Sequence, residues 1–257
     1  MTDQTDDETV AARTLRELGD AMSAARPRLD GDATDPAVPV AATVILLRDT
    51  AEGPEVLLLR RPDRGSFAGA WVFPGGKVEP ADAEGLPVDA HEEVVARVAG
   101  VRETAEEAGV ELAGEDLVTV SCWDPPPGAP LRIRTWFFVA PAPEGELVLQ
   151  PDEAVEHLWA RPGDVLERHG RGELTLYPPT WVTLHGLSGQ PDVEAVLAEA
   201  RLAGPRAFHT QVRAGDGGPV FFWQEDAEYA LGERDEASGA RHRLTATGLP
   251  WIYTRTL

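Results

Sequence analysis

The sequence predicts an α/β or α+β sandwich, in which helices cover the faces of a mixed β-sheet. Short apolar runs typical of buried strands alternate along the chain with segments of helical periodicity. Glycine, proline and aspartate separate most of these runs. A length of 257 residues with 42% hydrophobic residues allows a sizeable core. We therefore expect one large domain, or one domain with an appendage.

Apolar runs bounded by turn residues predict the strands. The first two are joined by a short turn that contains Gly53 and Pro54. The third runs into a glycine turn, and a loop over 77–88 follows it. The expected strands, in chain order, are 38–47, 54–61, 70–76, 116–123, 131–140, 157–161, 208–214, 219–224 and 251–255.

Terminal signals and periodicity predict the helices. The clearest helix begins near Asp89, which forms a candidate capping box with Glu92, and ends at Gly109. Shorter helical segments are expected at 162–169, 178–187 and 191–203. The chain thus divides into an acidic N-terminal extension (1–38), partly disordered or helical, a main domain (39–200) and a C-terminal β-rich extension (201–257) that packs on it.

Composition excludes several classes of partner. A net charge of -21 disfavours a nucleic-acid polymer or an anionic membrane. No apolar run is long enough to span a membrane, and no secretion signal is apparent. The single cysteine, Cys122, agrees with a reducing compartment. We expect a cytoplasmic enzyme acting on a small molecule.

The helix at 89–108 carries an unusual cluster of like charges in the stretch RETAEEAGV. Glu103, Glu106 and Glu107 are spaced i, i+3 and i+4, which is mildly unfavourable for carboxylates on a solvated face. Clustered carboxylates suit a hard divalent cation such as Mg²⁺ or Mn²⁺. On a helical wheel, the opposite face is the one expected to be buried; it consists of Val94, Val98, Val101, Ala105 and Ala108.

A glycine turn upstream is the expected partner of this cluster. The stretch FPGGKVEPAD contains Gly75 and Gly76, which allow backbone to approach a ligand or helix closely. Gly100 lies beside Glu103 and Glu107 on the wheel, at a cost of about 1 kcal/mol in helix propensity. We expect this bare patch to receive the glycine turn, so that loop and helix share one metal site.

Together these residues resemble the Nudix box, whose usual pattern is G-x5-E-x7-R-E-U-x-E-E-x-G-U, with U apolar. The matching positions are Gly76, Arg102, Glu103, Glu106, Glu107, Gly109 and Val110. The resemblance implies the Nudix α/β/α sandwich with a mixed sheet. It also implies a hydrolase that cleaves the diphosphate of a nucleoside diphosphate linked to another group.

The box departs from the usual pattern in one respect. Gly76 and Arg102 lie 26 positions apart, where the usual box has 14, so about twelve residues are inserted. Asp82 occupies the slot of the first box glutamate. The acid that serves there is Asp82, Glu79 or one inside the insertion.

The interrupted box resembles the branch that includes the peroxisomal acyl-coenzyme A diphosphatases and their bacterial relatives. Outer stretches such as LLLRR, RTWFFVA, YPPT and FFWQEDAEY extend this resemblance over roughly residues 38–230. Coenzyme A or acyl-coenzyme A is therefore the leading substrate, giving 3',5'-ADP and (acyl-)4'-phosphopantetheine. ADP-ribose, NADH, nucleotide sugars and dinucleoside polyphosphates are alternatives, and so is a non-catalytic binding or regulatory module.

The resemblance also implies roles for single residues. Glu106 and Glu107 would be the main metal ligands, Glu103 a further ligand or a base, and the Gly76 carbonyl would complete the metal site. Arg102 would pair with and orient a glutamate.

Residues outside the box are candidates on weaker grounds. Glu153 or Glu156 is a candidate additional ligand or general base, and exposed acids before a strand are an equal alternative. Arg60, Arg61, Lys77 and Arg134 are candidates for substrate phosphates. Nudix folds often pair, so a homodimer is a further expectation.

Overall fold

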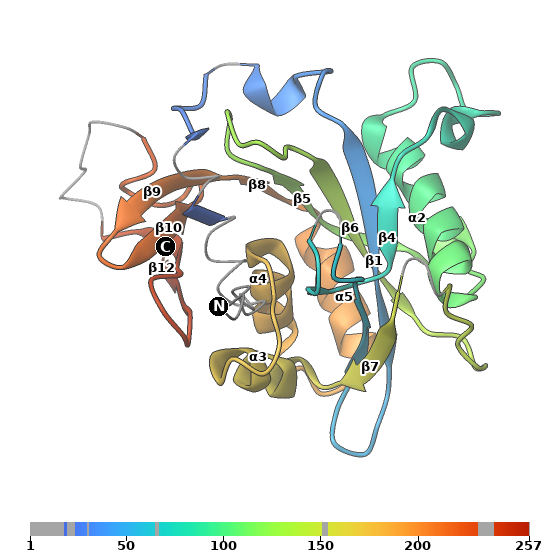
Figure 1. The fold of residues 1–257 in the computed structure, drawn as a ribbon. Coiled ribbons are helices and arrows are strands. Elements are labelled where there is room, and N and C mark those ends of the chain that lie inside the picture. The colour runs from blue at the N-terminus through green and yellow to red at the C-terminus, as the bar shows by residue number, and fades with distance from the viewer. Residues whose placement is uncertain are drawn as a thin grey trace, which may run out of the picture.

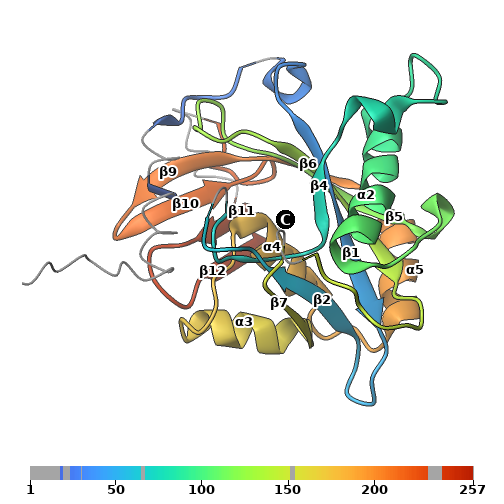
Figure 2. The same ribbon diagram turned by 45° about the vertical axis from the view of Figure 1, so that its right-hand side comes forward.

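A mixed β-sheet forms the centre of the fold, with helices on both of its faces (Figures 1 and 2). The computed structural model describes residues 18–19, 24–29, 31–64, 67–150, 154–230 and 239–256. The sheet has the order β3-β2-β1-β6-β5-β8, and β4 and β7 pair with β1 and β2 outside this path. Its strands are β1 (Val40–Arg48), β2 (Glu55–Arg60), β3 (Trp71–Val72), β4 (Gly75–Lys77), β5 (Val118–Asp124), β6 (Arg134–Pro141), β7 (Glu156–Ala160) and β8 (Arg206–His209).

Strand β1 is buried on both faces, which is why it reads as a continuous apolar run. Ile45 and Leu47 join a large core with α3, α4 and α5. Val44 and Leu46 join a smaller core with α2 on the other face. β1 pairs in parallel with β6 and antiparallel with β2 and β4. The α-helices are α2 (Glu92–Ala108), α3 (Pro162–Gly170), α4 (Pro178–Leu187) and α5 (Val193–Ala203), and short 3₁₀ turns are η1 (Asp32–Thr34), η2 (Pro80–Ala83) and η3 (Gly114–Asp116).

The buried face of α2 corrects the prediction made from its valines. Val94 and Val98 are 37% and 39% exposed, and the buried residues are Ala96, Ala99, Gly100, Thr104, Glu107 and Ala108. Small side chains on this face let the helix lie close to the sheet, so Glu107 and Glu103 lie on the inner side, whereas Glu106 is exposed. Val94 and Val98, although more hydrophobic, lie on the outer side, whereas Ala108 is buried as predicted and Val101 packs against the smaller core.

Gly100 also differs from its expected role. A Cβ atom at this position would lie 3.2 Å from Val44 Cγ2 and 3.5 Å from Ala42 Cβ, so Gly100 packs against β1 and not against the glycine turn. The helix begins after His91, whose side chain accepts a hydrogen bond from the Glu93 N–H, and Asp89 is not its cap. Its end at Gly109, with a φ of 67°, is as predicted.

The C-terminal part forms a second, antiparallel sheet with the order β12-β11-β10-β9. β10 and β12 were expected as strands, whereas β11 was not. The main sheet and this second sheet meet at Trp223, which follows β10 and whose ring lies 5.6 Å from that of Trp123 in β5 and 5.5 Å from that of Phe208 in β8. Trp223 and Trp251 belong to the same large core. The four strands are β9 (Gln211–Gly215), β10 (Gly218–Phe222), β11 (Arg241–Thr245) and β12 (Ile252–Thr256).

The helix expected within residues 1–38 falls largely outside the described residues. Of this part, Leu18 is buried in the large core, and Arg28 forms an ion pair with the buried carboxylate of Asp124. Within the described ranges, no helix combines the length and apolar character that crossing a membrane requires.

Candidate metal and phosphate site

The glutamate face of α2 is turned toward β4, the strand formed by the two glycines and Lys77. Gly75 N–H donates a hydrogen bond of 2.8 Å to Glu107 Oε2. The side chain of Glu107 is only 4% exposed, and Arg61 Nη1 lies 3.5 Å from its other carboxylate oxygen. A buried carboxylate is stable only with such partners. The strand and the helix are therefore joined through the charged group itself.

Gly76 lies against the second glutamate. A Cβ atom at Gly76 would lie 2.3 Å from Glu103 Cδ, which is far closer than any real contact. Gly75 is constrained independently: its φ is 150°, and an added Cβ would lie 2.2 Å from the carbonyl oxygen of Ala42. Each glycine is thus required for a different reason, one by the backbone of β1 and the other by the Glu103 carboxylate.

Arg102 connects the acids of the site. Its Nη1 lies 3.0 Å from Glu103 Oε1 and 3.0 Å from Glu106 Oε2. Its Nη2 also donates to the carbonyl oxygen of Lys77, at 3.1 Å. Hydrogen bonds to the surrounding carboxylates, that of Asp82 first, raise the pKa of Arg102 above its ordinary value. Arg102 therefore stays charged and sets the positions of two glutamates.

The structure shows what the interruption leaves in the first acidic slot of the box. Asp82 is buried and accepts two hydrogen bonds of 2.9 Å from Arg102. It also accepts one of 2.8 Å from the Glu79 N–H, which closes η2. The hydrogen bonds from Arg102 hold the pKa of the Asp82 carboxyl below its usual range. Asp82 therefore positions Arg102, and Glu79 caps η2 beside it.

The inserted residues form a loop after η2 and the first turns of α2 (Figure 1). The two acids that begin the helix are engaged away from the glutamate cluster. Glu92 pairs with Arg134 at 2.9 Å, and Glu93 pairs with Arg97. The inserted residues thus include the end of the helix that is distant from Glu103.

The candidate substrate residues separate into two groups. Arg61 lies at the site, because it forms an ion pair with Glu107. Arg60, at the end of β2, pairs with Asp63 at 3.2 Å. Lys77 has an exposed side chain next to Gly76. Arg134 is not brought to the site: it is 5% exposed and donates to Glu92 and to the carbonyl oxygens of Ala33 and Asp35. It joins the start of α2 to the N-terminal segment.

The donor set suits a hard cation by its chemistry, because it consists of carboxylate oxygens and backbone carbonyls. In the described ranges, no group of three or more His, Cys, Asp or Glu side chains is gathered tightly enough to hold a metal ion. The positive charge beside the glutamates comes from Arg102 and Arg61. Glu153 lies outside the described residues, and Glu156 is exposed and opposite Arg60 in β7.

Two features of the site were not predicted. One is that Gly75 and Gly76, expected as the turn at the end of the third strand, begin a separate strand, β4, which pairs with β1. The other is the hydrogen bond from Gly75 to Glu107. The glycine pair signalled a close approach, but only the tertiary structure shows which carboxylate meets which glycine.

Comparisons with known proteins agree with this geometry. The model of the NUDIX domain family matches residues 38–178. The CTP pyrophosphohydrolase of Escherichia coli (strain K12) is 30% identical over 113 residues, which is 44% of this chain and 71% of that protein. The crystal structure of a NUDIX hydrolase from Alicyclobacillus acidocaldarius is 29% identical with a TM-score of 0.56, covering 63% of this chain and 96% of that one. Because the family match spans more than half of the sequence and includes the glycine strand and the glutamate helix, the chain belongs to the NUDIX domain family and is a Nudix hydrolase.

Proposed function

We propose that this chain hydrolyses the diphosphate linkage of a nucleoside diphosphate derivative with the help of Mg²⁺ or Mn²⁺. The observation that carries the proposal is the inward face of α2, where Glu103 and Glu107 meet the two glycines of β4. Two carboxylates that meet a glycine strand, with a third, that of Glu106, paired to Arg102 beside them, suit a cation and the phosphates that it binds.

The metal ligands would be Glu106 and Glu107, with Glu103 as a further ligand or the base and the Gly76 carbonyl completing the set. A bound cation would neutralise phosphate charge and lower the pKa of a bound water. Arg102 positions Glu103 and Glu106 from the side. Arg61, which is partly exposed and beside Glu107, is placed to contact a phosphate oxygen. Glu153 or Glu156 is the candidate acid from outside the helix.

Coenzyme A and acyl-coenzyme A are the first substrates that we propose. Support comes from the interrupted box and from the outer stretches that resemble acyl-coenzyme A diphosphatases. A nucleoside triphosphate is a second candidate, because the Escherichia coli relative is named a CTP pyrophosphohydrolase. Both candidates present a phosphate anhydride to the same carboxylates, and the group attached to it distinguishes them.

A substrate panel tests this proposal. Coenzyme A, acyl-coenzyme A, CTP, ADP-ribose, NADH and diadenosine polyphosphates are incubated with Mg²⁺ or Mn²⁺, and the products are separated by chromatography. Release of 3',5'-ADP from coenzyme A is the expected result, and the Glu106→Gln and Glu107→Gln variants should abolish it. If CTP is the only substrate that is hydrolysed, giving CMP and diphosphate, the second candidate is favoured. Absence of turnover across the panel would contradict catalysis and favour a binding module.

The expected organisation of the chain also remains a proposal. We propose a main domain over 39–200, an extension over 1–38, and a C-terminal extension over 201–257 that packs on the main domain. The pairing of β8 with β5 and the shared aromatic core support the packing. A cytoplasmic location and a homodimer are proposed on the sequence grounds given above.

A further inference from the structure

A cavity of about 270 Å³ lies on the face of the sheet opposite α2. Its walls come from β5, α4, α5, β8 and β12, and they include Val139, Val182 and Val196 of the large core. The glutamate helix packs on the other face through the smaller core. The cavity is therefore separate from the proposed hydrolytic site, and the inference below does not depend on that site's function.

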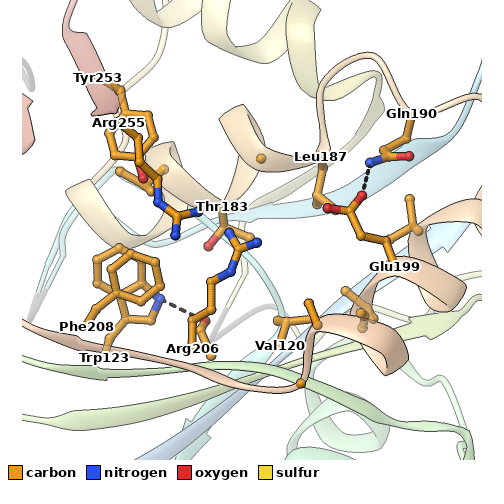
Figure 3. A pocket seen from close by; sticks show the side chains of 18 residues that line it. Val120, Trp123, Thr183, Leu187, Gln190, Glu199, Arg206, Phe208, Tyr253 and Arg255 are labelled. Atoms are coloured by element: carbon orange, nitrogen blue, oxygen red, sulfur yellow. Dashed lines mark hydrogen bonds between the residues drawn. The ribbon is translucent and has the colours of Figure 1, made fainter. Parts of the chain in front are cut away.

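Two arginines give this cavity a cationic end. Figure 3 shows the side chains of Arg206, from β8, and Arg255, from β12, turned toward each other beside Thr183. Among the described residues, no carboxylate lies within 4.0 Å of Arg206, and Arg255 has only Glu225 at 3.9 Å. The Nε atom of Arg255 is buried and has no hydrogen-bond partner. Arg206 is exposed to solvent and Arg255 is partly buried, so two guanidinium groups with little nearby negative charge face a ligand that enters from solution.

Tyr253 fixes the wall next to these arginines. Its hydroxyl lies 2.9 Å from His242 Nε2, and His242 Nδ1 lies 2.5 Å from Glu225 Oε2. With Nδ1–H donating to the Glu225 carboxylate, Nε2 accepts from the tyrosine hydroxyl. Because the hydroxyl hydrogen of Tyr253 is used in this bond, its oxygen can only accept a hydrogen bond from a ligand. The hydrogen-bond donors at this end of the cavity are therefore the two arginines and Thr183.

The rest of the cavity is mainly apolar. Val120, Val182, Leu187, Val196 and Ala200 line it from three different elements, above the stacked rings of Trp123 and Phe208. At the far end Gln190 Nε2 donates to Glu199 Oε2 at 2.5 Å (Figure 3). A negative charge at that end opposes an anion there. The ligand's anionic group is thus directed toward Arg206 and Arg255, and its apolar body toward α4 and α5.

We propose that this cavity binds a small amphipathic organic anion, whose carboxylate or phosphate group pairs with Arg206 and Arg255 and whose apolar chain lies between α4 and α5. Arginine pairs suit both head groups because each presents two oxygens to a planar donor. The volume is near the lower end of ordinary ligand sites, which span roughly 300–1,000 Å³, so the body is the size of a short alkyl chain or a single ring system.

Calorimetric titration of the full chain with octanoate, octyl phosphate and 1-octanol tests this inference. Both anions are expected to bind at least 10-fold more tightly than the neutral alcohol, and the tighter of the two identifies the preferred head group. The Arg206→Gln/Arg255→Gln double variant should weaken anion binding at least 10-fold. Arg201→Gln is the matched control, since Arg201 is an exposed arginine of α5 outside the cavity, and it should bind like the parent.

A second variant is designed to occupy the cavity with an added side chain. Gly186 lines the cavity, and a Cβ atom there would meet no other atom within 4 Å. Gly186→Phe should therefore fold with unchanged circular dichroism and lose binding of both anions. Equal binding of octanol and octanoate, or anion binding that survives both the double arginine variant and Gly186→Phe, would overturn the proposal.

Discussion

Arg102 donates two hydrogen bonds of 2.9 Å to Asp82, from Nε to Oδ1 and from Nη2 to Oδ2. This pair of hydrogen bonds joins η2, which precedes the inserted residues, to the part of α2 that follows them. The pair keeps the two halves of the box in register although the chain between them is longer than usual. Arg102 then positions Glu103 and Glu106, so the ion pair supports the site without being part of the proposed metal ligand set.

Replacing Asp82 with asparagine should cost about 1–3 kcal/mol in the free energy of unfolding, because a mostly buried charge-assisted pair is broken. Hydrolysis should fall as well, since Arg102 loses its anchor. Urea unfolding and steady-state kinetics measure the two effects. Asp164→Asn is the matched control: Asp164 makes the same two-bond contact with Arg161, but that pair is exposed to solvent and should contribute much less. Equal losses in both variants would contradict this account.

The two glycines of β4 should respond differently to alanine. Gly75→Ala places a Cβ against the backbone of β1 in a conformation that only glycine adopts readily, and it should lower the stability by about 2 kcal/mol or more. Gly76→Ala meets only the end of the Glu103 side chain, which can move. Its stability should change by less than about 1 kcal/mol, whereas its kcat should fall about 10-fold or more. Thermal unfolding together with kinetics separates the two cases, and a Gly76→Ala enzyme with full activity would remove Glu103 from the site.

His169 predicts part of the stability profile with pH. Burial lowers the pKa of His169 to about 4, and its ring packs on Trp251 with centroids 4.5 Å apart. The unfolded chain binds a proton near pH 6.5, whereas the folded chain does not. The contribution of neutral His169 to the free energy of unfolding is therefore complete above pH 6.5. It is lost as the pH falls to about 4, and it totals ~3 kcal/mol.

The His169→Leu variant should lack this part of the pH dependence. Urea unfolding from pH 4 to 8 gives the difference between the two proteins at each pH. The parent should lose stability relative to the variant as the pH falls from 6.5 to 4. A constant difference over that range would show that His169 is protonated equally in the folded and unfolded chains.

Local patterns were enough to predict most of the fold. Strands such as β1 and β2 are continuous apolar runs, and Gly109 ends α2 as expected, because these features depend on neighbouring residues in the sequence. The Nudix box likewise carries its own spacing, and the family match confirms the family that the box indicated. The interruption did not hide the box, since Gly76 precedes the insertion and the Arg102–Val110 half of the pattern follows it.

Features that depend on tertiary packing were not predictable. Hydrophobicity favoured Val94 and Val98 as the buried face of α2, whereas the close approach to β1 selected the small residues Ala99 and Gly100. Arg134 was a candidate for phosphate binding, and the structure uses it to hold Glu92. In both cases the outcome depends on which segment of the chain packs against the residue, and a single sequence does not contain that information.

Calorimetric titration of Mn²⁺ into the parent protein and the Glu107→Gln variant, with hydrolysis of the preferred substrate measured in parallel, tests the proposed metal site most directly. Glutamine can still accept the hydrogen bond from Gly75 but lacks the charge. The account predicts at least 10-fold weaker Mn²⁺ binding and a fall in kcat of about 10²-fold or more. Glu111→Gln, a change at an exposed glutamate just beyond α2, should leave both unchanged. Unaltered Mn²⁺ affinity and turnover in Glu107→Gln would contradict the assignment of a metal to the glutamate face of α2.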